Sequence, residues 1–163
     1  MIRVLFVCLG NICRSPMAEA IMRDLIEERG LTSKIKVDSA GTSSNHVGET
    51  PHKGTREKLK EMNISTSGMK ARQLSTSDLD FNYIVCMDTS NVKNTRDMLH
   101  AHDNTKIFRF LDLTPHKKDV PDPWYTGDFQ ETYELCVEGC EALLERILEE
   151  KGLLYPCYCT RSQ

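Results

Sequence analysis

The sequence predicts a single-domain α/β fold built on a doubly wound, mostly parallel sheet with helices on both faces. Short apolar runs that suit buried strands alternate with segments whose apolar residues recur at helical spacing. At 163 residues the chain has the usual size of one compact domain and can bury a core without disulfides or a structural metal. No repeat or linker divides it, so we expect one domain over residues 1–152 and a short C-terminal tail over 153–163.

The first strand is expected at residues 2–7, where β-branched and aromatic residues form a nearly continuous apolar run. Such a run is typical of a strand that is buried on both faces of a parallel sheet. The first helix follows the polar stretch 10–15. Ser15 is its expected cap and Pro16 its first residue, and Gly30 ends the helical spacing of apolar residues.

The remaining elements continue this alternation of strands and helices. Three further strands are expected, at residues 34–39, 82–87 and 107–110. Two short helices are expected between them, at residues 55–63 and 90–99.

The clearest helix is the last one. From Phe129 to Gly152 the apolar residues keep a stripe with a period of about 3.6, as expected for a helix with one buried side. The stretch 114–126 before it holds three prolines and several charges, so it is expected to be a surface loop.

The charge balance and the cysteines exclude several classes of protein. The net charge is −3, and no run of basic residues is dense enough to indicate nucleic-acid binding. The apolar stretch 4–9 leads directly into Gly10 rather than a cleavage site, and no stretch is long enough to span a membrane. The seven cysteines are an odd number without the regular spacing of a secreted disulfide framework. We therefore expect a cytoplasmic protein with no nucleic-acid or membrane partner.

The segment from Cys8 to Pro16 carries the clearest chemical signal. It lies between the first strand and the first helix, where unpaired backbone N–H groups and the positive end of the helix dipole bind anions. Gly10 lets the backbone curl closely around a tetrahedral oxyanion. We therefore expect a phosphate-binding loop that contains Leu9, Gly10, Asn11, Ile12, Cys13 and Ser15.

Cys8 and Arg14 give this loop its chemistry. The field that attracts phosphate also stabilises a thiolate at Cys8, which would make it a nucleophile. Arg14 offers a planar fork to two phosphate oxygens, and the Ser15 hydroxyl is expected to donate to the Cys8 sulfur while Asn11 braces the loop. The alternative is a buried core cysteine and a surface arginine, because a Cys-x5-Arg match also arises by chance.

The segment from Cys8 to Pro16, followed by Met-Ala-Glu-Ala, resembles the signature of the low-molecular-weight protein tyrosine phosphatases. The similarity extends to about Gly152 through the segments 38–42, 71–73, 86–88 and 122–125. The resemblance implies a four-stranded parallel sheet flanked by helices. It also implies two-step phosphotransfer from phosphotyrosine-containing proteins through a phosphocysteine, with no metal and no cofactor.

The same resemblance identifies Asp122 as the general acid and base. Hydrolysis of a tyrosine phosphate expels a phenolate whose conjugate acid has a pKa of about 10, so a positioned proton donor accelerates it. Asp122 lies between Pro121 and Pro123. From the residues alone, an aspartate in that setting is more often a turn residue, and only the resemblance reverses this interpretation.

The resemblance also indicates the pocket walls and the support of the loop. Trp124 and Tyr125 are expected to wall a slot deep enough for phosphotyrosine, while Asn45 stands on the opposite rim, where many members carry an aromatic residue. Met69 stands where animal members have a histidine that helps to order the loop. We therefore expect Ser39 and the loop asparagine to brace the loop by other contacts.

Cys13 has two interpretations. By resemblance it forms a reversible disulfide that protects Cys8 from irreversible oxidation, and the alternative is a packed thiol. Cys136 and Cys140 fall on the apolar stripe of the last helix, so they are expected in the core.

Three other functions are weighed against a tyrosine phosphatase. An arsenate reductase would need two more cysteines, and although Cys86 suits one of them, Lys93 and Asn94 stand in the next helix where no cysteine occurs. A protein arginine phosphatase has Thr where this chain has Ile12. A non-catalytic phosphopeptide-binding module would have no use for a nucleophile together with Asp122. We expect the tyrosine phosphatase, as a monomer or weak dimer.

Overall fold

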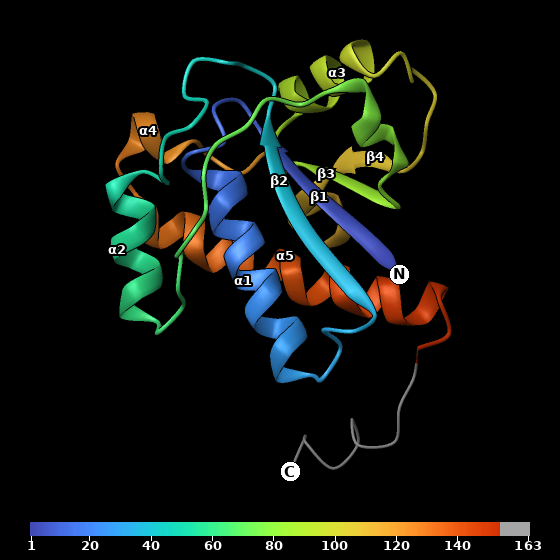
Figure 1. The fold of residues 1–163 in the computed structure, drawn as a ribbon, viewed down its shortest axis with the longest axis horizontal. Coiled ribbons are helices and arrows are strands. Elements are labelled where there is room, and N and C mark those ends of the chain that lie inside the picture. The colour runs from blue at the N-terminus through green and yellow to red at the C-terminus, as the bar shows by residue number, and fades with distance from the viewer. Residues whose placement is uncertain (154–163) are drawn as a thin grey trace.

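Four parallel strands form the centre of the molecule, in the order β2-β1-β3-β4 (Figure 1). They are β1 (Ile2–Cys8), β2 (Ile35–Gly41), β3 (Tyr83–Cys86) and β4 (Ile107–Arg109). This computed structural model describes residues 1–153, so nearly all of the tail expected at 153–163 lies outside the described residues. The four-stranded parallel sheet that the sequence and the family resemblance predict is confirmed.

Helices cover both faces of this sheet (Figure 1). On one face lie α1 (Arg14–Glu28) and α5 (Phe129–Glu150), with α2 (Lys53–Glu61) packed against them. On the other face lies α3 (Thr89–Met98). None of the helices within residues 1–153 is both long and apolar enough to cross a membrane.

The side chains of β1 alternate between the two halves of the core. Val4 and Phe6 join the cluster under α1 and α5, whereas Leu5 and Val7 join the cluster under α3. All four are fully buried, which explains the nearly continuous apolar run in the sequence. Phe6 packs edge to face against Phe110 at a ring distance of 5.3 Å, which ties the strand to the segment after β4.

Two helices begin earlier than the sequence predicts. The first, α1, begins at Arg14 with Cys13 in the cap position, although Ser15 was the expected cap. Pro16 fits the first turn because the N–H groups there need no partner within the helix. The second, α2, begins at Lys53 because the His52 side chain accepts a hydrogen bond from the Gly54 N–H.

The stretch 114–126, expected to be a loop throughout, ends in the single helical turn α4 (Pro123–Thr126). Asp122 caps this turn by accepting the Trp124 N–H, and Pro123 at the first position has the backbone angle that a helix needs. Two 3-10 turns, η1 (Thr76–Asp80) and η2 (Phe110–Leu113), were not predicted either. Elements this short span too few residues for an apolar periodicity to be visible in the sequence.

The chain reverses its direction of winding between β1 and β3, which are neighbours in the sheet. Loops that leave the carboxyl ends of two such strands diverge and leave a crevice, where α/β proteins bind ligands. The loop after β1 and residues 87–88 after β3 lie at this point. The fold therefore places the Cys8–Ser15 segment where the sequence analysis expects an anion site.

Candidate active site

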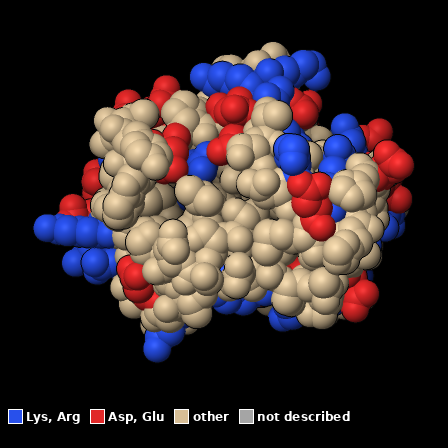
Figure 2. Space-filling model, turned by 90° about the horizontal axis from the view of Figure 1, so that it is seen from above, with Lys and Arg blue, Asp and Glu red and all other residues tan. Residues whose placement is uncertain are grey.

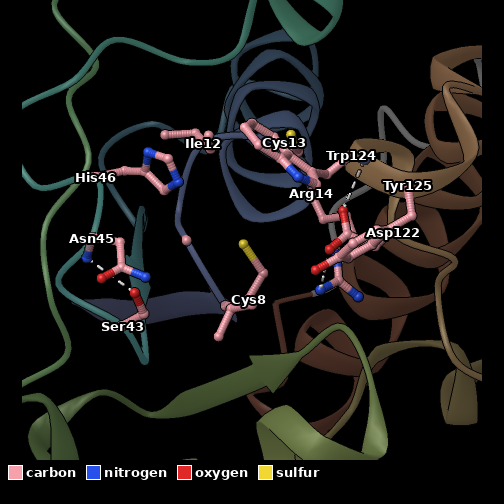
Figure 3. Close-up of a pocket in the computed structure, with 12 residues that line it drawn as sticks. Cys8, Ile12, Cys13, Arg14, Ser43, Asn45, His46, Asp122, Trp124 and Tyr125 are labelled. Carbon is pink, nitrogen blue, oxygen red and sulfur yellow. Dashed lines mark hydrogen bonds and ion pairs between the residues drawn. The ribbon is translucent and has the colours of Figure 1, made fainter.

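A pocket of about 250 Å³ opens beside the loop that joins β1 to α1 (Figure 3). Its lining comes from three parts of the chain: the end of β1 with the following loop, the segment 43–46, and the segment that ends in α4. The lining residues are Cys8, Leu9, Gly10, Ile12, Cys13, Arg14, Ser43, Asn45, His46, Asp122, Trp124 and Tyr125. Asn11 and Ser15, also expected in the loop, lie behind this lining.

The Cys8 sulfur sits at the bottom of the loop, within hydrogen-bond distance of two of its groups. The side chain is buried, with 3% exposure of the residue. Its Sγ lies 3.1 Å from the Ser15 Oγ and 3.3 Å from the Asn11 backbone N–H. Both groups are able to donate a hydrogen bond to this sulfur, an arrangement that a thiol packed in an apolar core would lack.

Arg14 lies beside Cys8 and is held in place by two elements. Its Nη1 donates to the Asp88 Oδ2 at 2.7 Å and to the Val120 carbonyl at 3.0 Å, and its Nη2 lies 3.5 Å from the Asp122 Oδ2. Burial by itself lowers the pKa of Arg14, but the sulfur of Cys8 and the two carboxylates outweigh this effect and raise the pKa. The guanidinium is therefore a permanent cation at the pocket.

Asn11 holds the loop from behind through its side-chain amide. The Nδ2 group donates to the Ser15 Oγ at 2.8 Å and to the Ser39 Oγ at 2.9 Å, while Oδ1 accepts the Arg72 N–H at 2.9 Å. Asn11 also has a positive φ of 58°, a conformation that asparagine tolerates better than most residues. Ser39 and Asn11 are thus in direct contact.

Glu19 completes this support, and the sequence analysis did not identify it. Its Oε1 accepts the Ser39 hydroxyl at 2.5 Å, and its Oε2 pairs with Arg23. Met69 lines a second cavity of about 450 Å³ together with Glu19 and Ser39. The thioether of Met69 cannot donate a hydrogen bond, and in this chain the Ser39 hydroxyl is held by the Glu19 carboxylate.

Asp122 points into the pocket from the N-cap of α4. Its Oδ1 accepts the Trp124 N–H at 3.0 Å, and its other oxygen is the one that faces Arg14. The preceding segment is tied to β3 because the Val120 N–H donates to the Met87 carbonyl at 2.9 Å. The carboxyl group is thereby brought to the same pocket as Cys8.

Aromatic side chains form one wall of the pocket and polar ones form the opposite rim. Trp124 and Tyr125 are largely exposed, with 53% and 79% of their accessible surface open to solvent. Asn45 and His46 line the other side of Cys8 (Figure 3). His46 was not singled out from the sequence, although its neighbour Asn45 was expected on this rim and was the available signal.

Cys13 lines the pocket as a thiol, and it is not in a disulfide with Cys8 here. Burial, together with Cys8 and Asp122, raises the pKa of Cys13 to about 12. Cys13 is thus protonated near neutral pH. Cys136 and Cys140 are fully buried on α5 within the core, as predicted.

Within residues 1–153, no group of three or more His, Cys, Asp or Glu side chains is arranged to hold a metal ion.

Asp88 is a further residue that the sequence analysis quoted only as part of a motif. It lies two residues after the end of β3, so its position at the carboxyl edge of the sheet was the available signal.

The comparisons with known proteins agree with one another. The family model described as "Low molecular weight phosphotyrosine protein phosphatase" matches residues 3–153. The low molecular weight protein-tyrosine-phosphatase YfkJ of Bacillus subtilis is 53% identical over 156 residues, which cover 94% of this chain and 100% of that protein.

Solved structures extend the agreement to three dimensions. The crystal structure of YfkJ matches with a TM-score of 0.90 and covers 93% of this chain and 97% of its own. The low molecular weight protein tyrosine phosphatase of Streptococcus pyogenes matches with a TM-score of 0.83 at 39% identity, covering 94% of this chain and 97% of its own. Sequence and structure thus agree over nearly the full length, and this chain belongs to the low molecular weight phosphotyrosine protein phosphatase family.

Proposed function

We propose that this chain hydrolyses phosphotyrosine in proteins through a phosphocysteine intermediate. One observation carries the proposal. A thiol, a guanidinium and a carboxyl group, those of Cys8, Arg14 and Asp122, line one pocket of about 250 Å³ at the N-terminus of α1. These are the nucleophile, the phosphate clamp and the proton donor that the reaction needs.

In the first step, the Cys8 thiolate attacks the phosphorus of the bound ester. The sulfur–phosphorus bond forms as the bond from phosphorus to the phenol oxygen breaks, and the carboxyl group of Asp122 gives its proton to that oxygen. Arg14 and the backbone N–H groups of the loop balance the charge on the other phosphate oxygens. Asp88 holds the guanidinium from behind, at 2.7 Å, so that its fork keeps facing the pocket.

In the second step, water attacks the phosphorus of phosphocysteine while the Asp122 carboxylate takes a proton from it. The sulfur–phosphorus bond breaks, inorganic phosphate is released, and the electron pair returns to the Cys8 sulfur. The Ser15 hydroxyl and the Asn11 N–H, at 3.1 and 3.3 Å, stabilise the sulfur as it leaves. Both steps thus use the same three side chains in turn.

The pocket walls support a tyrosine ester as the substrate. Trp124 and Tyr125 rise beside Asp122 and give the aryl ring of a phosphotyrosine apolar surface, whereas the short side chain of phosphoserine would not reach the sulfur. The molecular face at the carboxyl ends of the strands is uncharged over much of its centre, with charges of both signs around it (Figure 2). The relatives are named tyrosine phosphatases. On these grounds we propose phosphotyrosine-containing proteins as substrates. We further propose, from the pattern of cysteines, that the protein acts in a reducing cytoplasm.

Steady-state hydrolysis of a phosphotyrosine peptide tests this function. Cys8→Ser is expected to abolish turnover, and Asp122→Asn to slow it about a hundredfold or more while leaving phosphate binding largely intact. Turnover is expected to persist in the presence of a chelator. Cys136→Ala is the matched control, since this buried thiol lies outside the pocket lining. Full activity in Cys8→Ser would overturn the proposal.

A further inference from the structure

His52 contacts the phosphate-binding loop without lining the pocket. Its backbone N–H donates to the Ile12 carbonyl at 2.7 Å, and its Nδ1 accepts the Gly54 N–H at 3.0 Å as the cap of α2. Because Nδ1 accepts a hydrogen bond here, the neutral ring carries its proton on Nε2. Two bonds on one residue therefore fix both the place and the rotation of the imidazole.

The ring of His52 is also held by an aromatic partner. It stacks on Phe129 at the start of α5, with ring centres 5.1 Å apart and planes 19° apart. Phe129 in turn packs against Ile12 and Cys13 of the loop. Gly54 makes room for this arrangement, because a Cβ there would lie 2.4 Å from the Phe129 ring. The imidazole and the phenyl ring thus form a fixed platform beside the phosphate-binding loop.

Trp124 of α4 rests on this platform. Its indole meets the His52 ring edge to face at 5.6 Å and an interplanar angle of 76°. A second imidazole, that of His46, lies 5.7 Å from it on the other side of the pocket mouth. His46 is itself held by Glu49, which lies 3.0 Å from its Nδ1. Besides the ties of Val120 and Asp122 to Arg14, the indole therefore gives the Asp122 segment two aromatic contacts with the rest of the active-site rim.

Asp122 depends on Trp124 through the cap of α4. The backbone N–H of Trp124 donates to the Asp122 Oδ1 at 3.0 Å, so the carboxyl group caps the same turn that carries the indole. Four residues of helix have few bonds of their own, and they take their position from what they pack against. A shift of the turn that displaces Trp124 would therefore also displace the carboxyl group that caps it.

We propose that His52 is a positioning residue for Asp122. Its ring, fixed by the α2 cap and by Phe129, holds Trp124 and through it keeps the carboxyl group over Cys8. This inference rests on the proposed function, since it concerns the proton donor of that reaction. His52 itself touches neither the substrate nor the reacting atoms.

The expected signature is a change in leaving-group dependence. A misplaced acid slows the expulsion of a phenolate that needs protonation, and it hardly affects a leaving group that departs as a stable anion. The value of kcat/KM across a series of aryl phosphates, from phenyl to 2,4-dinitrophenyl, measures this dependence for the first step. A general loss of folding or of phosphate binding would lower all members of the series alike.

Two variants separate the ring from the cap. His52→Asn keeps a side-chain acceptor for the Gly54 N–H but has no ring to meet Trp124. It is expected to lower kcat/KM for phenyl phosphate about tenfold and to leave 2,4-dinitrophenyl phosphate within about twofold. His52→Phe keeps a ring but loses the acceptor, so it is expected to lower the Tm without steepening the leaving-group dependence. His116→Asn, at an exposed histidine paired with Glu138, is the matched control. It is expected to change neither the Tm nor the dependence of kcat/KM on the leaving group.

The Asp122→Asn background decides whether His52 acts through the acid. There His52→Asn is expected to add no further loss, because no proton remains to be placed. The inference would be overturned if His52→Asn lowered kcat/KM equally for all the aryl phosphates. It would also be overturned if His52→Asn lowered kcat/KM by the same factor in the parent protein and in Asp122→Asn. If Asp122→Asn alone did not steepen the dependence of kcat/KM on the leaving group, the role of Asp122 as the acid in the proposed function would be wrong, independently of His52. Trp124→Leu, expected to steepen the dependence as well, provides the same test if His52→Asn does not fold.

Discussion

The hydrogen bonds of Asn11, Ser15 and Ser39 behind the Cys8 sulfur determine in which direction each of these side chains donates its protons. The Arg72 N–H donates to the Asn11 Oδ1, so the Nδ2 group of that amide must face Ser15 and Ser39. Both protons of Nδ2 are then used, and the two hydroxyl oxygens are acceptors. The Ser15 proton is left for the Cys8 sulfur and the Ser39 proton for the buried Glu19 carboxylate.

Glu19→Ala tests this order of hydrogen bonds. The Ser39 hydroxyl would lose its charged acceptor, a bond of about 1.5 to 3 kcal/mol, and with it the fixed position from which it holds Asn11. We expect kcat for aryl phosphates to fall about fivefold and the alkylation of Cys8 by iodoacetate at neutral pH to slow. Asp24→Ala, at an exposed acid on the same helix, is the matched control. Equal rates in both variants would contradict the role of Glu19.

Residues were predictable where their chemistry depends on neighbours in the sequence. Cys8 and Arg14 share one loop, so a strand, a turn and a helix were enough to predict that they lie in one pocket. Glu19 was missed because its partner Ser39 is 20 positions away, on another element. His52 was missed for the same reason, since Trp124 approaches it only in the folded chain.

At the scale of elements, α5 approaches the segment after β4 through a residue with no side chain. Gly139 lies in the middle of α5, and a Cβ there would sit 2.6 Å from two atoms of the Phe110 ring. That ring is fully buried and packs on Phe6, so it has no room to retreat. The sequence analysis predicted α5 from its apolar stripe, but periodicity alone does not show why a glycine interrupts it.

Gly139→Ala is expected to destabilise the protein although alanine is the better helix former. The gain in helix propensity is about 1 kcal/mol, whereas overpacking a core costs about 1 to 3 kcal/mol, so the clash prevails. Urea unfolding followed by circular dichroism measures the difference. Adding Phe110→Leu is expected to relieve the clash, which would make the double variant more stable than the two single effects predict. A Gly139→Ala protein more stable than the parent would show that the ring can yield.

The single-turn α4 shows what short elements require. Apolar periodicity becomes visible in a sequence only over several helical turns. The stretch 114–126 contains prolines and charged residues instead, which predicted a loop. The turn forms because Asp122 caps it and Pro123 opens it. Both residues were singled out for another reason, so a cap and a proposed proton donor coincide in one carboxyl group.

At the scale of the whole molecule, the core holds several thiols on both sides of the sheet. Burial is the main reason that the pKa values of Cys86 and Cys136 rise from 9.0 to about 12, and it raises that of Cys140 well above the same value. Cys86 belongs to the cluster under α3, and the other two belong to the cluster under α1 and α5. Folding therefore keeps these thiols protonated at a pH where the unfolded chain would ionise them.

The free energy of unfolding is therefore expected to fall as the pH rises from about 9 towards 12. Below pH 9 both states hold these protons, and above it only the folded state does, so ionisation stabilises the unfolded chain by about 1.4 kcal/mol per pH unit for each buried thiol. Cys86→Ala removes one such group. The variant is expected to be less stable at neutral pH because of the cavity, but its stability should decline less steeply with pH, by that amount. Urea unfolding between about pH 8 and 10 measures both slopes, and parallel curves would mean that Cys86 does not contribute to the alkaline loss of stability.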